Sequence, residues 1–389
     1  MRTPVLALVS ALGLITLLLI DAPSVPTLLS RILPVLGFVA AMSVVVAAAG
    51  AVNTFGAVIG KVQAVLGLGG ATPGRGSSAR AWALILGVSL VITVFFSLDT
   101  TAILVTPLVI TLARGVGIHP LAAAFAVIWM ANLGSLLLPI SNLTNLLAVQ
   151  TDAFDGIADY VAVSWLPALV LVVVAGIAPL VVARFLHVTP DGQAGVISGG
   201  TPGLDRETKV FTGLIGVLLI ALLMPVDVWI PTTVAALIAL GLLRHWSLPT
   251  PVHHMIPWAT LLFAFSLTTG AAIIHSLSLL DPVLSALSDS GMFALAFAGV
   301  VLSNLINNIP AYLALEPAAS SPESFMALLI GVNAGPIITP WASLATLLWA
   351  HQARQQGVQV GWGMFVVGGL VLAPVAVLTG VGVLNLNYG

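Results

Sequence analysis

Residues 131–149 read ANLGSLLLPISNLTNLLAV, and residues 332–350 read VNAGPIITPWASLATLLWA. The two stretches align without a gap at an offset of 201 residues, and six of their 19 positions are identical. The identical pairs are Asn132 and Asn333, Gly134 and Gly335, Pro139 and Pro340, Leu143 and Leu344, Leu146 and Leu347, and Leu147 and Leu348. Asn, Gly and Pro at matching places inside apolar stretches indicate an internal repeat, in which each unit contains a broken helix.

The composition around these stretches is that of a membrane protein. Only 24 of the 389 residues are charged, which is 6% of the chain, whereas soluble domains carry about 25%. Hydrophobic residues make up 59% of the chain, and the mean hydropathy is +1.17. Only helices or closed barrels span lipid, and the apolar runs here are too long and continuous for barrel strands. The sequence therefore predicts an all-α polytopic membrane protein.

The same numbers exclude several classes of protein. A net charge of −2 excludes a basic nucleic-acid surface. Because the chain has no cysteine, it has no disulfides, thiolate metal sites or thiol chemistry. The sequence contains no P-loop and no enzymatic constellation. We therefore predict no cofactor, no metal, no catalytic residue and no nucleic-acid partner, and expect the lipid bilayer to surround the chain.

Nine apolar runs are predicted to span the membrane: 5–20, 32–52, 121–149, 160–182, 210–224, 229–243, 256–274, 325–350 and 362–384. Two further apolar stretches, 81–112 and 292–315, carry polar residues at their middle. The loops separate into a basic set and an acidic set, and the positive-inside rule places the basic set and the N-terminus in the cytoplasm. The stretches 81–112 and 292–315 must then each enter and leave the membrane on the same side. We predict that they are re-entrant hairpins that open to opposite sides of the membrane.

Opposed hairpins predict two inverted-topology repeats, each with a re-entrant hairpin and a broken transmembrane helix. The first repeat covers residues 1–188, and the second covers residues 210–389. The polar segment 189–209 joins them as a cytoplasmic linker.

The polar residues of the breaks and hairpins are the candidate binding site. A broken helix in lipid leaves N–H and C=O groups that must be buried in protein or face a wet cavity. Such breaks near the midplane form the binding sites of transporters, although single Ser, Thr and Asn residues often only join helices. The candidates are Asn132, Gly134, Ser141, Asn142, Thr144 and Asn145 in the first break, Asn304, Asn307 and Asn308 in the second hairpin, and Asn333, Gly335, Thr339 and Ser343 in the second break.

The tip of the first hairpin, Ser97-Leu98-Asp99-Thr100-Thr101, contains the only carboxylate predicted deep in the membrane. An ionisable residue at that depth is costly and by default indicates a function. We predict that Asp99, with Thr100 beside it, binds and releases a coupling proton. The alternative is a structural Asp held by the neighbouring Thr hydroxyls.

Four stretches resemble the arsenite-efflux permeases of the ion transporter superfamily: FSLDTTAILVTPLV at 96–109, SNLTN at 141–145, NLINNIP at 304–310 and GPIITPWASLATLLW at 335–349. The resemblance implies a scaffold domain and a transport domain bearing both hairpins, an elevator-type movement and a homodimer. It also implies export of arsenite or antimonite driven by an inward proton gradient, in some members with a separate ATPase subunit.

The favoured function is therefore proton-coupled export of arsenite or antimonite across the plasma membrane of the cell. Three alternatives stay open on the sequence. The Asn and Thr tips could hold Na⁺ in a sodium-coupled anion or dicarboxylate transporter. Asp99 could serve a Na⁺/H⁺ antiporter. A receptor or assembly subunit that transports nothing is the third alternative.

Overall fold

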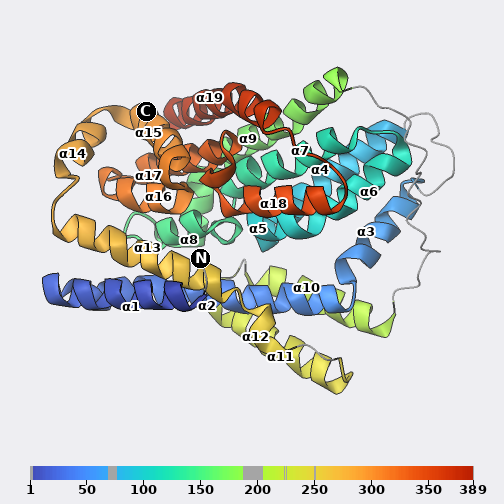
Figure 1. The fold of residues 1–389 in the computed structure, drawn as a ribbon, viewed down its shortest axis with the longest axis horizontal. Coiled ribbons are helices and arrows are strands. Elements are labelled where there is room, and N and C mark those ends of the chain that lie inside the picture. Colours follow the sequence, from blue (N-terminus) through green and yellow to red (C-terminus); the bar gives the residue numbers. More distant parts are fainter. Residues whose placement is uncertain are drawn as a thin grey trace.

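The computed structural model describes residues 3–68, 77–186, 205–222, 224, 226–248 and 251–388, and within these ranges every regular element is a helix. The prediction of an all-α membrane protein is thus confirmed. Figure 1 shows a layer of long helices lying beneath a larger bundle. We call these two parts the lower layer and the main bundle. The predicted linker falls outside the described residues over 189–204.

The lower layer is formed by helices from both halves of the sequence. Its members are α1 (Thr3–Ile20), α2 (Ser24–Ala51), α10 (Arg206–Ala221), α11 (Trp229–His245), α12 (Val252–Met255) and α13 (Trp258–Ser276). The α2 helix packs along α11, and α1 packs along α13. Each of these pairs joins a helix near the N-terminus to one that follows residue 205.

The main bundle contains both hairpins and both breaks. In the first half it comprises α4 (Ser77–Phe96), α5 (Leu98–Thr100), the π-helix η1 (Thr101–Val105), α6 (Thr106–Val116), α7 (Pro120–Leu133), α8 (Leu143–Val149) and α9 (Ile157–Phe185). In the second half it comprises α15 (Gly291–Ile306), α16 (Asn308–Leu315), η4 (Glu316–Ala318), α17 (Pro322–Ala334), α18 (Leu344–Gln355) and α19 (Trp362–Tyr388). The helices α3 (Thr54–Val65) and α14 (Asp281–Asp289) lead from the lower layer into the bundle.

Seven of the described helices are long and apolar enough to cross a membrane: Thr3–Ile20, Ser24–Ala51, Ser77–Phe96, Leu98–Val116, Ile157–Phe185, Trp258–Ser276 and Trp362–Tyr388. The predicted spans 210–224 and 229–243 are the shorter helices α10 and α11, with 16 and 17 residues. The two broken spans consist of the shorter helices α7 and α8 in the first half and α17 and α18 in the second. The chain is a multi-pass membrane protein.

The helix α2 extends beyond the predicted span 32–52, and α14 lies outside the predicted spans. The α2 helix begins at Ser24 instead of residue 32, because Pro26 lies in the first turn, where no intrahelical N–H bond is lost. Arg31 also does not end the helix, since its charge is paired with Glu316. The segment expected to be a loop after α13 forms α14, with Pro282 in its first turn.

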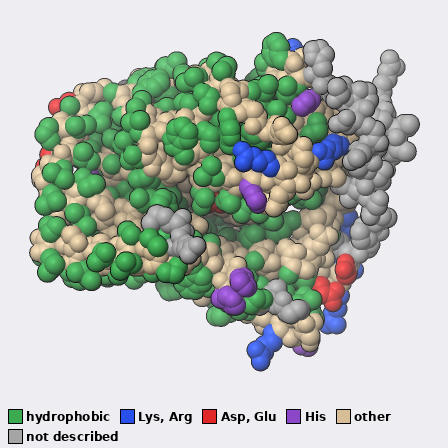
Figure 2. Space-filling view, in the orientation of Figure 1, with side chains coloured by type: hydrophobic (Ala, Val, Ile, Leu, Met, Phe, Trp, Pro, Cys, Tyr) green, Lys and Arg blue, Asp and Glu red, His purple; other side chains and the backbone are tan. Residues whose placement is uncertain are grey.

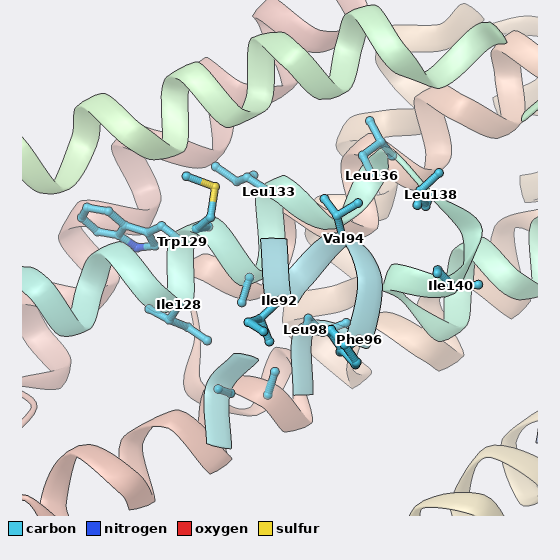
Figure 3. Packing of buried hydrophobic residues seen from close by; sticks show 14 of the residues in the cluster. Ile92, Val94, Phe96, Leu98, Ile128, Trp129, Leu133, Leu136, Leu138 and Ile140 are labelled. Carbon is cyan, nitrogen blue, oxygen red and sulfur yellow. The ribbon is translucent and has the colours of Figure 1, made fainter. Parts of the chain in front are cut away.

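The centre of the bundle is close-packed through small residues. All residues of α7 from Leu121 to Leu133 are buried, and a side chain on Gly331 of α17 would collide with the backbone of Ala296 on α15. Without a hydrophobic driving force between helices in lipid, such close backbone contacts are a main source of association. Figure 3 shows how the apolar side chains of the hairpin tip, among them Phe96 and Leu98, pack near those of the first break.

We expect Gly331→Ala to destabilise the protein, because the added methyl group must displace the Ala296 backbone. Overpacking of this kind costs about 1–3 kcal/mol. Gly241→Ala is the matched control, since Gly241 also lies inside a helix but has open space around the position of a Cβ. There alanine should stabilise the helix slightly. Thermal unfolding of the purified proteins tests this, and equal melting temperatures would contradict the close contact.

Candidate functional site

The two broken helices have the same backbone conformation. Each break contains two short 3₁₀ turns, η2 (Gly134–Leu136) and η3 (Pro139–Ser141) in the first and η5 (Gly335–Ile337) and η6 (Pro340–Ala342) in the second. Extended residues flank the second turn: Leu138 has φ −117° and ψ 146°, and Thr339 has φ −114° and ψ 147°. The internal sequence match therefore corresponds to matching local structure. The inverted orientation of the two units stays a prediction.

The two hairpin tips also match each other. Ser97 has φ 105° and ψ 157°, and Asn307 has φ 93° and ψ 155°. Each side chain caps the helix that follows: Ser97 Oγ accepts from the N–H of Thr100 at 3.3 Å, and Asn307 Oδ1 accepts from the N–H of Ile309 at 3.3 Å. Non-glycine residues rarely adopt a positive φ, and such strained residues cluster at ligand sites and switch regions.

The carbonyl groups of the first break are bonded by side chains. An unpaired carbonyl would cost several kcal/mol in lipid, and three donors prevent this. The bonds run from Tyr160 OH to Leu136 O at 2.8 Å, from Ser164 Oγ to Leu137 O at 3.0 Å, and from Asn145 Nδ2 to Ser135 O at 2.7 Å. Asn145 was predicted as a binding residue, and here its amide nitrogen holds the break together. Tyr160 and Ser164 were not predicted.

The second break is held mainly by Asn304 of the second hairpin. Its Oδ1 accepts from the backbone N–H of Thr339 at 3.0 Å and from the Thr339 hydroxyl at 2.6 Å. Its Nδ2 donates to Gly335 O at 3.0 Å. The neighbouring Asn307 donates to Trp341 O at 3.0 Å. The hairpin and the break are thus one hydrogen-bonded unit.

The two breaks are joined to each other by an amide pair. Asn142 Nδ2 donates to Asn333 Oδ1 at 2.8 Å, and both side chains are buried. In the part of the chain that the structure describes, Asn333 Nδ2 and the hydroxyl of Ser303 are buried and have no hydrogen-bond partner. A buried donor without an acceptor costs about 1–3 kcal/mol. These two groups are therefore suited to a polar solute between the repeats, and Ser303 joins the predicted candidates.

Asp99 lies on α5, which contacts α7 and α18. Its carboxylate makes no hydrogen bond or ion pair with any described residue, and its side chain is half-buried. Neither neighbouring Thr hydroxyl bonds the carboxylate: Thr101 donates to Ser97 O at 3.0 Å, and Thr100 Oγ1 accepts from Ser97 Oγ at 3.2 Å. The hydrogen bonds thus do not support a capped, purely structural Asp99. Its role in proton coupling, with Thr100, stays a prediction.

Three of the other predicted residues make hydrogen bonds to described groups. Asn132 donates to Ile128 O within its own helix at 2.9 Å, Ser141 donates to Val94 O of the first hairpin at 2.9 Å, and Thr144 donates to Asn145 Oδ1 at 3.5 Å. Asn308 and Ser343 are buried near the hairpin tip and the break. Gly134 and Gly335 give close packing, since a Cβ on Gly335 would lie 2.8 Å from Ser303 Cβ. Among the described residues, no group of three or more His, Asp or Glu could hold a metal ion.

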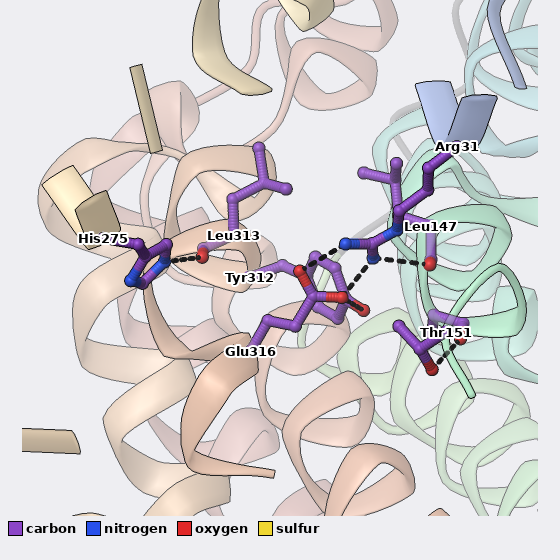
Figure 4. A network of polar contacts seen from close by, with 8 residues as sticks. Arg31, Leu147, Thr151, His275, Tyr312, Leu313 and Glu316 are labelled. Carbon is purple, nitrogen blue, oxygen red and sulfur yellow. Dashed lines mark hydrogen bonds and ion pairs between the residues drawn. The ribbon is translucent and has the colours of Figure 1, made fainter. Parts of the chain in front are cut away.

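A polar network that the sequence did not reveal joins α2 to the main bundle (Figure 4). The Arg31 guanidinium pairs with both carboxylate oxygens of Glu316, with Nη1 2.9 Å from Oε2. Arg31 Nη2 also donates to Leu147 O at 2.7 Å, and Tyr312 OH donates to Glu316 Oε1 at 2.8 Å. Arg31 and Glu316 are 285 residues apart, and no local pattern relates them.

These membrane helices, hairpins and hydrogen-bonded breaks define a polytopic permease of the ion-transporter type. The family described as "Citrate transporter" matches residues 1–325, and the chain belongs to this family. It is therefore a membrane transporter and not an enzyme.

The chain is also similar to the arsenical pump membrane protein of Escherichia coli (strain K12), with 27% identity over 334 residues. The arsenical pump membrane protein of Yersinia enterocolitica is 28% identical over 338 residues. Each match covers 79% of this chain and 77% of the relative. The predicted resemblance to arsenite permeases is confirmed.

We expect Tyr160→Phe to lower the free energy of unfolding by about 1–3 kcal/mol, because it leaves the buried Leu136 carbonyl without a donor. Tyr388→Phe is the control: its hydroxyl donates to Ala162 O at 3.0 Å, but the side chain is 49% exposed. Water can replace that bond, so the change should stay within about 0.5 kcal/mol. Denaturation of both variants in the same detergent makes the comparison. Equal losses would show that the break does not depend on Tyr160.

Proposed function

We propose that this permease exports arsenite or antimonite from the cell in exchange for protons. The main support is the buried Asn142–Asn333 pair, which joins the two breaks and leaves a free amide N–H at the centre of the bundle. Neutral amides and hydroxyls suit arsenous acid, which is mostly uncharged at neutral pH. The names of the relatives, arsenical pump membrane proteins, agree with this substrate.

Asp99 carries the proton in this proposal. Its carboxylate is free of partners in the described structure, and the α5 turn that bears it contacts α7, the helix that leads into the first break. Protonation from the outside and release inside would alter the charge next to the solute. That change is what couples the two fluxes. The remaining predicted site residues hold the breaks and hairpins in the shape that the solute meets.

The movement that exposes the site on alternate sides is proposed to occur between the two parts of the fold. The main bundle carries both hairpins and both breaks, while the lower layer carries none of the candidate residues. The bundle would act as the moving part of an elevator, and the lower layer as the fixed scaffold. A homodimer in the plasma membrane, a cytoplasmic N-terminus and an optional ATPase subunit complete the proposal.

A second candidate is a sodium-coupled transporter of a dicarboxylate or related anion. The family description, "Citrate transporter", favours it. Proteoliposomes separate the two functions: arsenite flux that needs a pH gradient and ignores sodium supports the first. Citrate flux that needs sodium, without arsenite flux, supports the second and overturns the first.

We expect Asp99→Asn to reduce arsenite flux driven by a pH gradient about tenfold or more, because the amide cannot carry a proton. Asp155→Asn is the control, as Asp155 is exposed and precedes α9. Flux into proteoliposomes is measured with and without an imposed gradient. Full gradient-driven flux in the Asp99→Asn variant would overturn the proton-coupling role.

We expect Asn142→Ala and Asn333→Ala each to weaken arsenite transport, and the double variant to be hardly worse than either single one. Residues that act as one unit are not additive in a double-mutant cycle. Asn387→Ala serves as the control, since the Asn387 amide nitrogen bonds Val383 O at 2.8 Å on an exposed part of α19. Initial export rates over a range of arsenite concentrations provide the measurement. Losses that simply add would show that the two residues do not form a joint site.

A further inference from the structure

Two side chains of the lower layer make hydrogen bonds to the main bundle at the end that carries η4. One is Arg31 of α2, which pairs with Glu316 and bonds Leu147 O. The other is His275 of α13, whose Nε2 lies 3.0 Å from Leu313 O. Both reach the end of α16 and the turn that follows it, as Figure 4 shows. The hydrogen bonds of Arg31 and His275 to the main bundle thus lie at the same end of the molecule.

That end carries acidic residues. Glu316 is followed by Glu323 at the start of α17, and Asp281 begins α14, which contacts η4. Arg31 is thus a basic residue among acidic ones. Its pairing with Glu316 explains why it is tolerated at the end that the positive-inside rule assigns to the outside.

The other end of the same interface is open. A cavity of about 500 Å³ lies between α3 and α4 on one side and α10 on the other, lined by apolar side chains such as Val88, Val91 and Leu219. Figure 2 shows a hollow between the lower layer and the main bundle, on the half of this face where Lys and Arg gather. The two parts are therefore tied at the acidic end and separated at the basic end.

The Arg31 contacts also reach the candidate site. Leu147 lies in the last turn of α8, and α8 begins directly after Asn142. Its carbonyl is one of those that a helix end leaves without an intrahelical partner. One guanidinium therefore links the lower layer, the end of the second hairpin and the second half of the first break. The side chains of Arg31 and Glu316 are 25% and 13% exposed, so the pair lies at the edge of the interface.

We propose that the Arg31–Glu316 pair is a latch that holds the lower layer and the main bundle together at the outer end, and that it opens and closes once in each transport cycle. The structure is then the state in which this pair is closed and the apolar cavity between α4 and α10 is present. This inference rests on the proposed movement between the two parts. It adds the contact that holds one end state, and it makes Arg31 a positioning residue for α8.

Labelling of a single introduced cysteine tests the latch without any substrate. The chain has no cysteine of its own, and Thr212 on α10 lines the open cavity. In the Thr212→Cys protein, Glu316→Gln or Arg31→Met should lower the rate of maleimide labelling about fivefold, because the open state loses its stabilising contact. The double variant should match the single ones, since the two residues act as one pair. Glu323→Gln removes an acidic charge at the same end and should leave the rate unchanged.

A cross-link provides the second measurement, with the same protein as its own control. In the Arg31→Cys/Glu316→Cys protein, a reducible bifunctional reagent joins the two cysteines. This cross-link should block arsenite flux, and its reduction should restore the flux. Unchanged labelling in the folded single variants, or full flux in the cross-linked protein, would overturn the latch. Labelling that changes as expected in a protein that moves no arsenite would overturn the proposed substrate and leave the latch standing.

Discussion

Every backbone group inside a bilayer needs a hydrogen-bond partner, and the two broken helices are where this requirement is hardest to meet. The chain meets it with side chains. Tyr160, Ser164 and Asn145 donate to carbonyls of the first break. In the second break Asn304 accepts from the N–H and the hydroxyl of Thr339 and donates to Gly335 O. The breaks can therefore keep their irregular shape at the centre of an apolar bundle. The bonds of Asn304 also fix the second hairpin against the second break.

The two repeats reach the same backbone shape by different contacts. In the first break two of the three donors come from α9, which follows the break. In the second break the amide nitrogens of Asn304 and Asn307 donate from the hairpin that precedes it. This difference leaves the site unsymmetrical. Asn142 Nδ2 donates to Asn333 Oδ1, whereas Asn333 Nδ2 and the hydroxyl of Ser303 have no hydrogen-bond partner among the described residues. Two breaks with the same backbone shape thus present different sets of hydrogen-bond donors.

Few of the described hydrogen bonds join the lower layer to the main bundle. The described contacts are concentrated around Arg31, Glu316 and His275 at one end. Apolar side chains line the other end. A few hydrogen bonds at an edge can break and form again without leaving charges stranded in the middle of the protein.

The membrane class, the helical fold and the places of both breaks follow from local sequence, because composition and the positions of Asn, Gly and Pro are properties of single segments. That the candidate residues bind a solute stays a prediction, and the sequence did not show which hydrogen bond each of them makes. Whether Asn145 faces a solute or bonds Ser135 O depends on how α8 packs against the preceding turn. Arg31 and Glu316 are the clearest case. Each is a lone charge in its own segment, and only folding brings together residues 285 positions apart and gives the ion pair.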